Sequence, residues 1–169
     1  SVPAVNSALQ RARRALQQLH KGSETPLAQP RPQLQDLLDR YVALWEQDDI
    51  PSFVALLRED AWFTMPPFPA WFQGRAALAV LFQSPLFTAA PSRRLLPTRA
   101  NGSPAFGFYL EEAETGVYEL FGLMVLEVVD EQIASIVAFL EPRSFSSFAL
   151  PPTLPSSLRE SATDHDFPV

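Results

Sequence analysis

The chain has 169 residues, of which 47% are hydrophobic and 19% are charged, and its formal net charge is −6. This balance fits one folded domain with short appendages and excludes a chain that is disordered throughout. There is no cysteine, and the two histidines lie near opposite ends, at His20 and His165. Disulfides, thiolate sites and a multi-histidine zinc site are therefore excluded, and we expect no metal. We find no secretory signal and no apolar stretch of the roughly 18 to 20 residues that span a membrane, so we expect a cytoplasmic protein without a membrane partner.

The charges are distributed unevenly. Residues 1–21 carry four basic residues and no acidic residue, whereas residues 22–169 carry nine basic and nineteen acidic residues. A basic segment attracts polyanions such as DNA, and an acidic body repels them. The two parts are therefore expected to have different partners.

An amphipathic helix is predicted over residues 3–20. Its apolar residues recur at steps of three and four, at Val5, Leu9, Ala12, Leu16 and Leu19. One interpretation is a solvated basic helix that packs on a neighbour. The other is a recognition helix, because Asn and Gln can bond to base edges while Arg can contact phosphate or guanine. Its candidate DNA-binding residues are Asn6, Ser7, Gln10, Arg11, Arg13 and Arg14.

The next segment, residues 22–33, is rich in proline and poor in apolar residues, which predicts a linker. Apolar residues at helical spacing then run from Leu34 to Trp45 and predict the first helix of the body. Pro51 is expected to open a second short helix, because proline is tolerated in a first helical turn. Residues 74–82 predict a third helix.

Beyond and between these helices the pattern changes to that of strands. Residues 61–65 predict one strand, which Pro66 ends, and four more are predicted over residues 93–101, 104–112, 117–129 and 132–141. Asn101-Gly102 is a strong hairpin signal, whereas Asp130-Glu131 is a weak one because neither residue takes a positive φ as readily as glycine. Helices followed by such a meander indicate an α+β fold, with about three helices on one face of a curved, mostly antiparallel sheet.

Two parts of the sequence resemble known families. The run Ser1-Val2-Pro3-Ala4-Val5-Asn6-Ser7-Ala8-Leu9-Gln10-Arg11-Ala12-Arg13 resembles the end of the promoter-reading helix-turn-helix of extracytoplasmic-function (ECF) sigma factors. The element order over roughly residues 33–142 resembles the cone-shaped nuclear-transport-factor-like fold, in its SnoaL-like branch. More narrowly, Met65–Trp71 and Pro97–Phe106 resemble the SnoaL-like tail domain of certain sigma factors.

These resemblances imply four regions. Residues 1–21 would be a remnant recognition helix of the DNA-binding domain, separate from the body, and residues 22–33 would be a linker. Residues 34–142 would form the SnoaL-like domain, and residues 143–169 a Pro/Ser-rich tail. The large apolar residues of that tail, such as Phe145 and Leu150, suggest that it docks on the body or on another sigma domain.

A curved sheet capped by helices can enclose a ligand cavity. The candidate lining residues are Trp62, Met65, Trp71, Arg99, Asn101, Phe106, Phe108, Tyr109 and Glu119. The aromatic residues among them could instead fill a core. For Arg99 three alternatives stay open: it binds a ligand carboxylate, pairs with Glu119 or faces solvent.

The resemblance implies a regulatory domain of a sigma factor that directs RNA polymerase to promoters in transcription initiation. Its partners would be core RNA polymerase, promoter DNA, other domains of the same sigma factor and a small apolar ligand in the cone. SnoaL-like enzymes pair a carboxylate base with a histidine or tyrosine acid, but the body holds no histidine, so we expect no catalytic residue and no cofactor. The alternatives are a SnoaL-like isomerase, cyclase or hydrolase, and a dimerisation scaffold that forms a homodimer.

Overall fold

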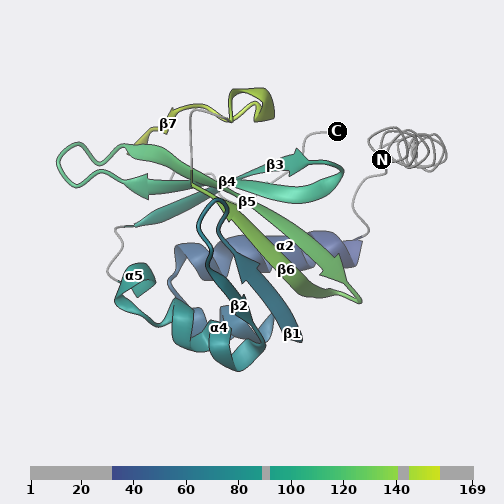
Figure 1. Ribbon diagram of the computed structural model, residues 1–169. Coiled ribbons are helices and arrows are strands. Elements are labelled where there is room, and N and C mark those ends of the chain that lie inside the picture. Colours follow the sequence, from purple (N-terminus) through teal and green to yellow (C-terminus); the bar gives the residue numbers. More distant parts are fainter. Residues whose placement is uncertain (1–31, 89–91, 141–144, 157–169) are drawn as a thin grey trace, which may run out of the picture. The chain divides into compact units, whose positions relative to one another are not determined.

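The computed structural model describes residues 32–88, 92–140 and 145–156, which belong to one compact unit (Figure 1). The predicted helix over residues 3–20, with its candidate DNA contacts, lies outside the described residues. None of the described helices is long and apolar enough to cross a membrane.

Four α-helices lie in the described residues: α2 (Pro32–Glu46), α3 (Ile50–Ala55), α4 (Arg75–Phe82) and α5 (Pro85–Thr88). The apolar positions of α2 recur at helical spacing, so this helix buries one continuous stripe against the sheet. The stripe consists of Leu37, Leu38, Tyr41, Val42 and Trp45. At the start of α3, the Asp49 carboxylate accepts a hydrogen bond from the Ser52 amide at 3.2 Å and caps the helix.

The strands form one sheet, with β7 paired to β5 beside the main order β2-β1-β6-β5-β4-β3. Their bounds are β1 (Leu57–Thr64), β2 (Trp71–Gln73), β3 (Arg93–Ala100), β4 (Ser103–Glu111), β5 (Tyr118–Val129), β6 (Gln132–Phe139) and β7 (Thr153–Leu154). Only the β1–β6 pair among these described strands is parallel. The predicted α+β fold with a mostly antiparallel sheet is therefore confirmed.

Irregular pairing bends this sheet. The register shifts in β1 between Leu57 and Trp62, between β4 and β5 at Phe108 and Tyr109, and between β5 and β6 near Val128. Such bulges increase the local twist and curvature of a strand. The helices cover one face of the bent sheet, and the C-terminal segment, defined as residues 145–156, lies on the opposite face (Figure 1).

Several short elements were missed from the sequence: β2, α5, β7 and a 3-10 helix at Ser146–Phe148. They are two to four residues long, too short for a hydrophobic period to show. The first strand begins at Leu57 rather than at residue 61, because the polar residues of its bulge broke the expected pattern. The expected docking of the tail on the body is confirmed for the C-terminal segment, whose Phe145, Leu150 and Leu154 are buried.

The two hairpin turns give a testable contrast. Asn101 and Gly102 both have positive φ, as their sequence predicts, and so do Asp130 and Glu131, at 50° and 61°. A left-handed conformation costs a residue with a Cβ roughly 1 to 2 kcal/mol, and Asp is one of the few residue types that adopt it with less strain.

Glu131→Gly is therefore expected to raise the free energy of unfolding by about 0.5 to 1 kcal/mol, because the relief of strain exceeds the extra entropy that glycine gives the unfolded chain. Urea denaturation measures this change. Asp130→Gly is the control, with an expected effect near zero. A loss of stability in Glu131→Gly would contradict this description of the turn.

Candidate functional site

The helix-facing side of the sheet is packed with aromatic rings. Tyr41 and Trp45 of α2 contact Phe106 and Phe108 of β4, with ring centroids 5.1 Å and 5.7 Å apart. The same cluster continues through rings from α3, α4, α5 and β1, at centroid separations of 4.9 to 6.1 Å: Phe53, Phe82, Phe87 and Phe63. Tilted and edge-to-face ring pairs at such distances are those of a packed core. Aromatic side chains therefore occupy the region where the sequence suggested a ligand.

The one hydroxyl group in this ring cluster is poorly suited to acid–base chemistry. Tyr41 donates a hydrogen bond to the sulfur of Met124 at 3.1 Å, and burial raises the pKa of Tyr41 far above its usual range. A general acid or base works best with a pKa near the ambient pH. Among the described residues, the only buried polar or charged side chains other than tyrosine and tryptophan are Arg93 and Thr98, so this face presents no buried carboxylate base.

Sequence reasoning missed Arg93, which enters the helix-facing core from β3. Its side chain is 4% exposed and donates to the Asp48 carboxylate at 2.6 Å and to the carbonyl of Phe87. Its guanidinium carbon lies 5.5 Å from the centre of the Trp45 ring. The alternation of β3 places Arg93 on the same face as Leu95, which could have indicated its burial. The arginine joins the end of α2 and helix α5 to the sheet.

The structure does not bring the nine candidate pocket residues together. Phe106 and Phe108 lie in the helix-facing core, and Met65 packs against it. Trp62 and Trp71 are exposed, because the core side of β1 is taken by Phe63. Asn101 is exposed in the β3–β4 turn. The last three occupy other places: Arg99, Tyr109 and Glu119.

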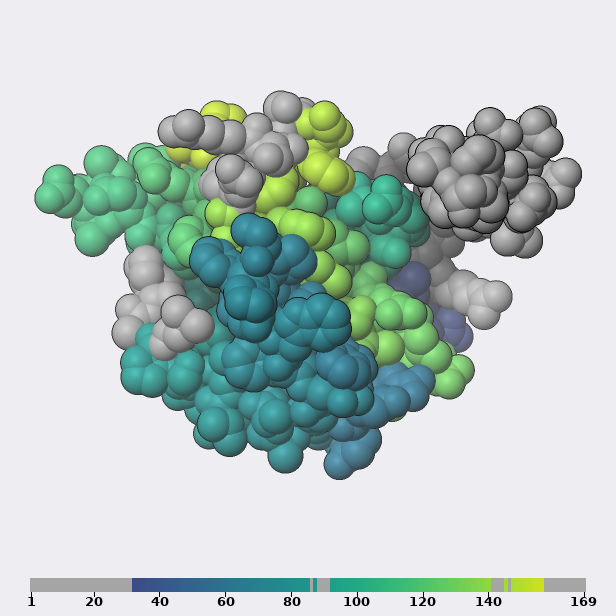
Figure 2. All heavy atoms as spheres, in the orientation of Figure 1, coloured from purple at the N-terminus to yellow at the C-terminus, as the bar shows by residue number. Residues whose placement is uncertain are grey.

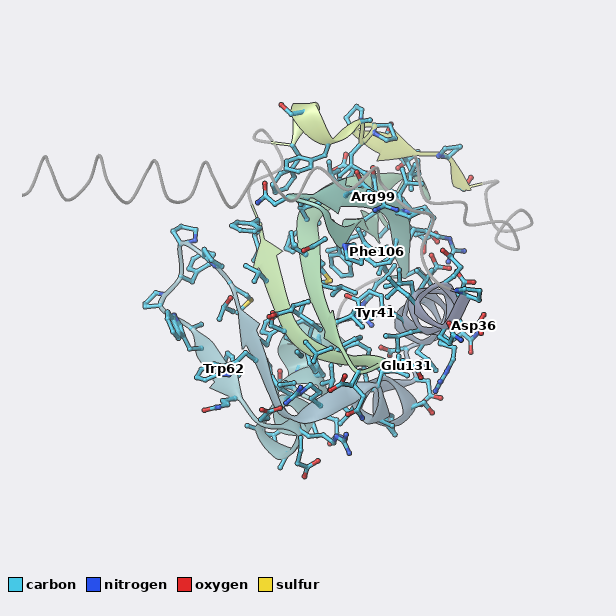
Figure 3. All side chains as sticks on the ribbon, turned by 90° about the vertical axis from the view of Figure 1, so that its right-hand side faces the viewer. Asp36, Tyr41, Trp62, Arg99, Phe106 and Glu131 are labelled. Atoms are coloured by element: carbon cyan, nitrogen blue, oxygen red, sulfur yellow. The ribbon has the colours of Figure 1, made fainter. Side chains whose placement is uncertain are left out.

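Arg99 lies near Phe106 at the end of β3 (Figure 3). It is half-buried, and its Nε atom is buried without a hydrogen-bond partner. Its predicted pairing with Glu119 is wrong: Glu119 stands in register with Leu110, which pairs with the first residue of β3, at the other end of the strand. The two remaining alternatives for Arg99, a ligand carboxylate and solvent, stay predictions. Among the described residues, no group of acidic or histidine side chains could hold a metal ion.

Tyr109 lies on the opposite side of the sheet, under the C-terminal segment. Its hydroxyl donates to the carbonyl of Pro151 at 2.8 Å, and burial raises its pKa to about 12. At a pH above about 10 the unfolded chain loses this proton while the folded chain keeps it, so the folded state binds more protons. Stability therefore falls as the pH rises from about 10 to about 12.

The Tyr109→Phe variant should be about 1 kcal/mol less stable at neutral pH, because the Pro151 carbonyl loses its donor. It should also lose stability less steeply than the wild type above about pH 10, because phenylalanine has no proton to lose. Urea denaturation at a series of pH values measures both effects. Equal slopes for the two proteins would show that Tyr109 is not held in its neutral form. The raised pKa of Tyr41 also makes stability fall as the pH rises, but it does so equally in both proteins and cancels in the comparison.

Comparison with known proteins shows which proteins the chain is related to. It is 38% identical over 156 residues to the ECF RNA polymerase sigma factor SigG of two Mycobacterium tuberculosis strains, CDC 1551 / Oshkosh and ATCC 25618 / H37Rv. The chain is homologous to part of an ECF sigma factor. The alignment covers 91% of this sigma-factor homologue and 42% of the curated relatives, so the chain spans less than half their length. No protein-family profile matches it.

Solved structures identify the fold of this sigma-factor homologue. An NTF2-like protein of unknown function from Burkholderia xenovorans superposes with a TM-score of 0.52 at 12% identity, over 75% of this chain and 90% of that chain. A Kribbella flavida protein provisionally assigned as a ketosteroid isomerase gives 0.51 at 23% identity, over 73% and 86%. At these identities the likeness shows the fold alone. The fold is NTF2-like, as the sequence resemblance implied.

Proposed function

We propose that the chain is the C-terminal part of an ECF sigma factor. In this proposal residues 1–21 end the promoter-reading domain, residues 22–33 link it to the body, and the body from residue 34 is a regulatory module. The observation that carries the proposal is the 38% identity to SigG, which extends over nearly the whole chain. The intact protein would bind core RNA polymerase and promoter DNA.

The body would act by contact rather than by catalysis. The aromatic cluster on its helix-facing side and the raised pKa of Tyr41 support this part of the proposal, because neither suits a proton transfer near neutral pH. The body would modulate initiation through contacts with other domains of the sigma factor or through a small ligand. No cofactor enters the proposal.

The promoter-reading role is tested with the full-length protein that contains this chain. Each of Arg13→Ala and Arg14→Ala should weaken promoter binding and reduce its salt dependence by about one unit of slope, because each would remove a phosphate contact. Gln10→Ala should instead reduce discrimination between promoters, because it would remove a contact to a base edge. Binding to a promoter fragment at several salt concentrations measures these effects. If promoter affinity and its salt dependence were unchanged in all three variants, residues 1–21 would not be part of the DNA interface.

A further inference from the structure

The β1–β2 hairpin exposes three large aromatic side chains, which neither the core nor the proposed function uses. Trp62, Phe68 and Trp71 are 39%, 55% and 72% exposed. The rings of Trp62 and Trp71 contact each other edge to face, with centroids 6.3 Å apart. Exposed aromatic clusters of this kind mark interaction sites, and tryptophan is one of the residue types enriched among those that dominate binding energy.

The strand register places these tryptophans on one face of the sheet. Trp71 stands opposite Thr64, and Thr64 stands opposite Val137 of β6. Directly paired residues point to the same face of a sheet, and so do residues two apart on one strand. Trp62, Trp71 and the partly exposed Phe139 therefore share the face that the helices leave free. We call this set, with Val137, the tryptophan face.

The tryptophan face is the half of a larger apolar surface that the described residues leave exposed. On the other half, over β3, β4 and β5, the C-terminal segment buries Ala100, Ala105 and Leu123 with its own Phe145 and Leu150. Figure 2 shows the β1–β2 hairpin, in blue, standing uncovered at the front of the molecule, and Figure 3 shows Trp62 on the side of the sheet away from Tyr41 and Phe106.

Carboxylates border the tryptophan face. Glu127 stands opposite Ser135, which in turn stands opposite Trp62, so the three side chains form one row across the sheet. The Glu127 carboxylate accepts a hydrogen bond from the Ser135 hydroxyl at 3.1 Å and is exposed. Asp60, Glu127 and Asp130 all raise the pKa of Arg58. These four groups, one guanidinium and three carboxylates, carry a net negative charge close to Glu127.

We propose that the tryptophan face binds a basic, amphipathic segment of a partner protein. Apolar side chains of the segment would cover Trp62 and Trp71, while its Arg or Lys side chains would stack on the exposed indole faces and pair with Glu127. A second copy of the body fits less well, because residues 22–169 carry nineteen acidic and nine basic residues and two such surfaces repel each other. The inference concerns this surface alone and stands whether or not the proposed transcription role holds.

The test uses two designed helical peptides of 16 residues, one with leucine on one face and arginine on the other, and one with glutamate in place of each arginine. Binding to the full chain is followed by calorimetry and by tryptophan fluorescence. The arginine peptide should bind saturably and the glutamate peptide should not. Trp71→Ser should reduce the affinity about tenfold or more, as expected for an anchor residue. Glu127→Gln should reduce both the affinity and its dependence on salt.

Val80→Ser is the matched control, because Val80 is also 72% exposed but lies on helix α4. It should bind the arginine peptide like the wild type. The proposal is overturned if the arginine peptide does not bind, if Trp71→Ser binds as tightly as Val80→Ser, or if both peptides bind equally. It is also overturned, in favour of self-association, if sedimentation shows a wild-type dimer that Trp71→Ser abolishes. All substituted positions are exposed, and equal melting temperatures for the variants would establish that they fold.

Discussion

Replacing Arg93 by alanine is expected to lower the free energy of unfolding by about 3 kcal/mol. The change removes a buried hydrogen bond to the Phe87 carbonyl, and the loss of a buried donor costs about 1 to 3 kcal/mol. It also removes the bond to Asp48, the contact with the Trp45 ring and the volume of a buried side chain. Urea denaturation followed by far-UV circular dichroism measures the loss.

Arg94→Ala is the matched control for this prediction, because it makes the same substitution one residue further along β3. Arg94 bonds to Glu46 at 3.1 Å and lies over the Tyr118 ring, but its side chain is partly exposed. Its loss should cost only about 1 kcal/mol, as expected for a partly solvated ion pair. Equal losses in the two variants would mean that Arg93 is not the buried link between α2, α5 and the sheet.

Gly107→Val is expected to displace the C-terminal segment from the sheet and to cost about 2 to 3 kcal/mol. A Cβ on Gly107 would lie 2.8 Å from a methyl group of Leu150 and 2.9 Å from the Tyr109 ring, closer than packed atoms approach. The larger side chain therefore competes with Leu150 for one place on β4. Limited proteolysis should cleave the C-terminal segment, residues 145–156, much faster in the variant than in the wild type.

A double-mutant cycle separates displacement from a general loss of strand stability. Leu150→Ala removes the group that valine would strike, so Gly107→Val should cost less in that background than in the wild type. The single change Leu150→Ala should itself be destabilising, because Leu150 packs against Ala105 and Leu123. Strict additivity of the two changes would contradict a direct contact between positions 107 and 150.

The main elements of the fold could be predicted because long elements carry a hydrophobic period. The stripe of α2 and the four strands from residue 93 to residue 139 lie within a few residues of their predicted bounds. The parallel pairing of β1 with β6 could not be predicted, since it joins segments about seventy residues apart and no local pattern encodes it. The turn at Asp130-Glu131 could be predicted although its two residues are poor turn formers, because the strand patterns on both sides of it leave only this place for a turn.

The candidate site was less predictable. Alternation along a strand shows that Trp62 and Phe63 face opposite ways, but it does not show which of them meets the helices. The choice is made by the aromatic rings of Trp45, Phe53 and Phe82, which come from three helices and meet only in the folded chain. Alternation also did not show which face of β4 Tyr109 lies on, so it was assigned to the cone. The segment that covers Tyr109 could not be inferred locally, because it begins 36 residues further on, at Phe145.

The most direct test of the regulatory role is run-off transcription with purified core RNA polymerase, measured without and with candidate small ligands. It compares the full-length protein that contains this chain with the same protein ended after Lys21. If the body modulates initiation, promoter output should change on truncation by about fivefold or more, the lower range of allosteric coupling. Identical output from the two proteins at every salt concentration, with and without candidate ligands, would contradict the account.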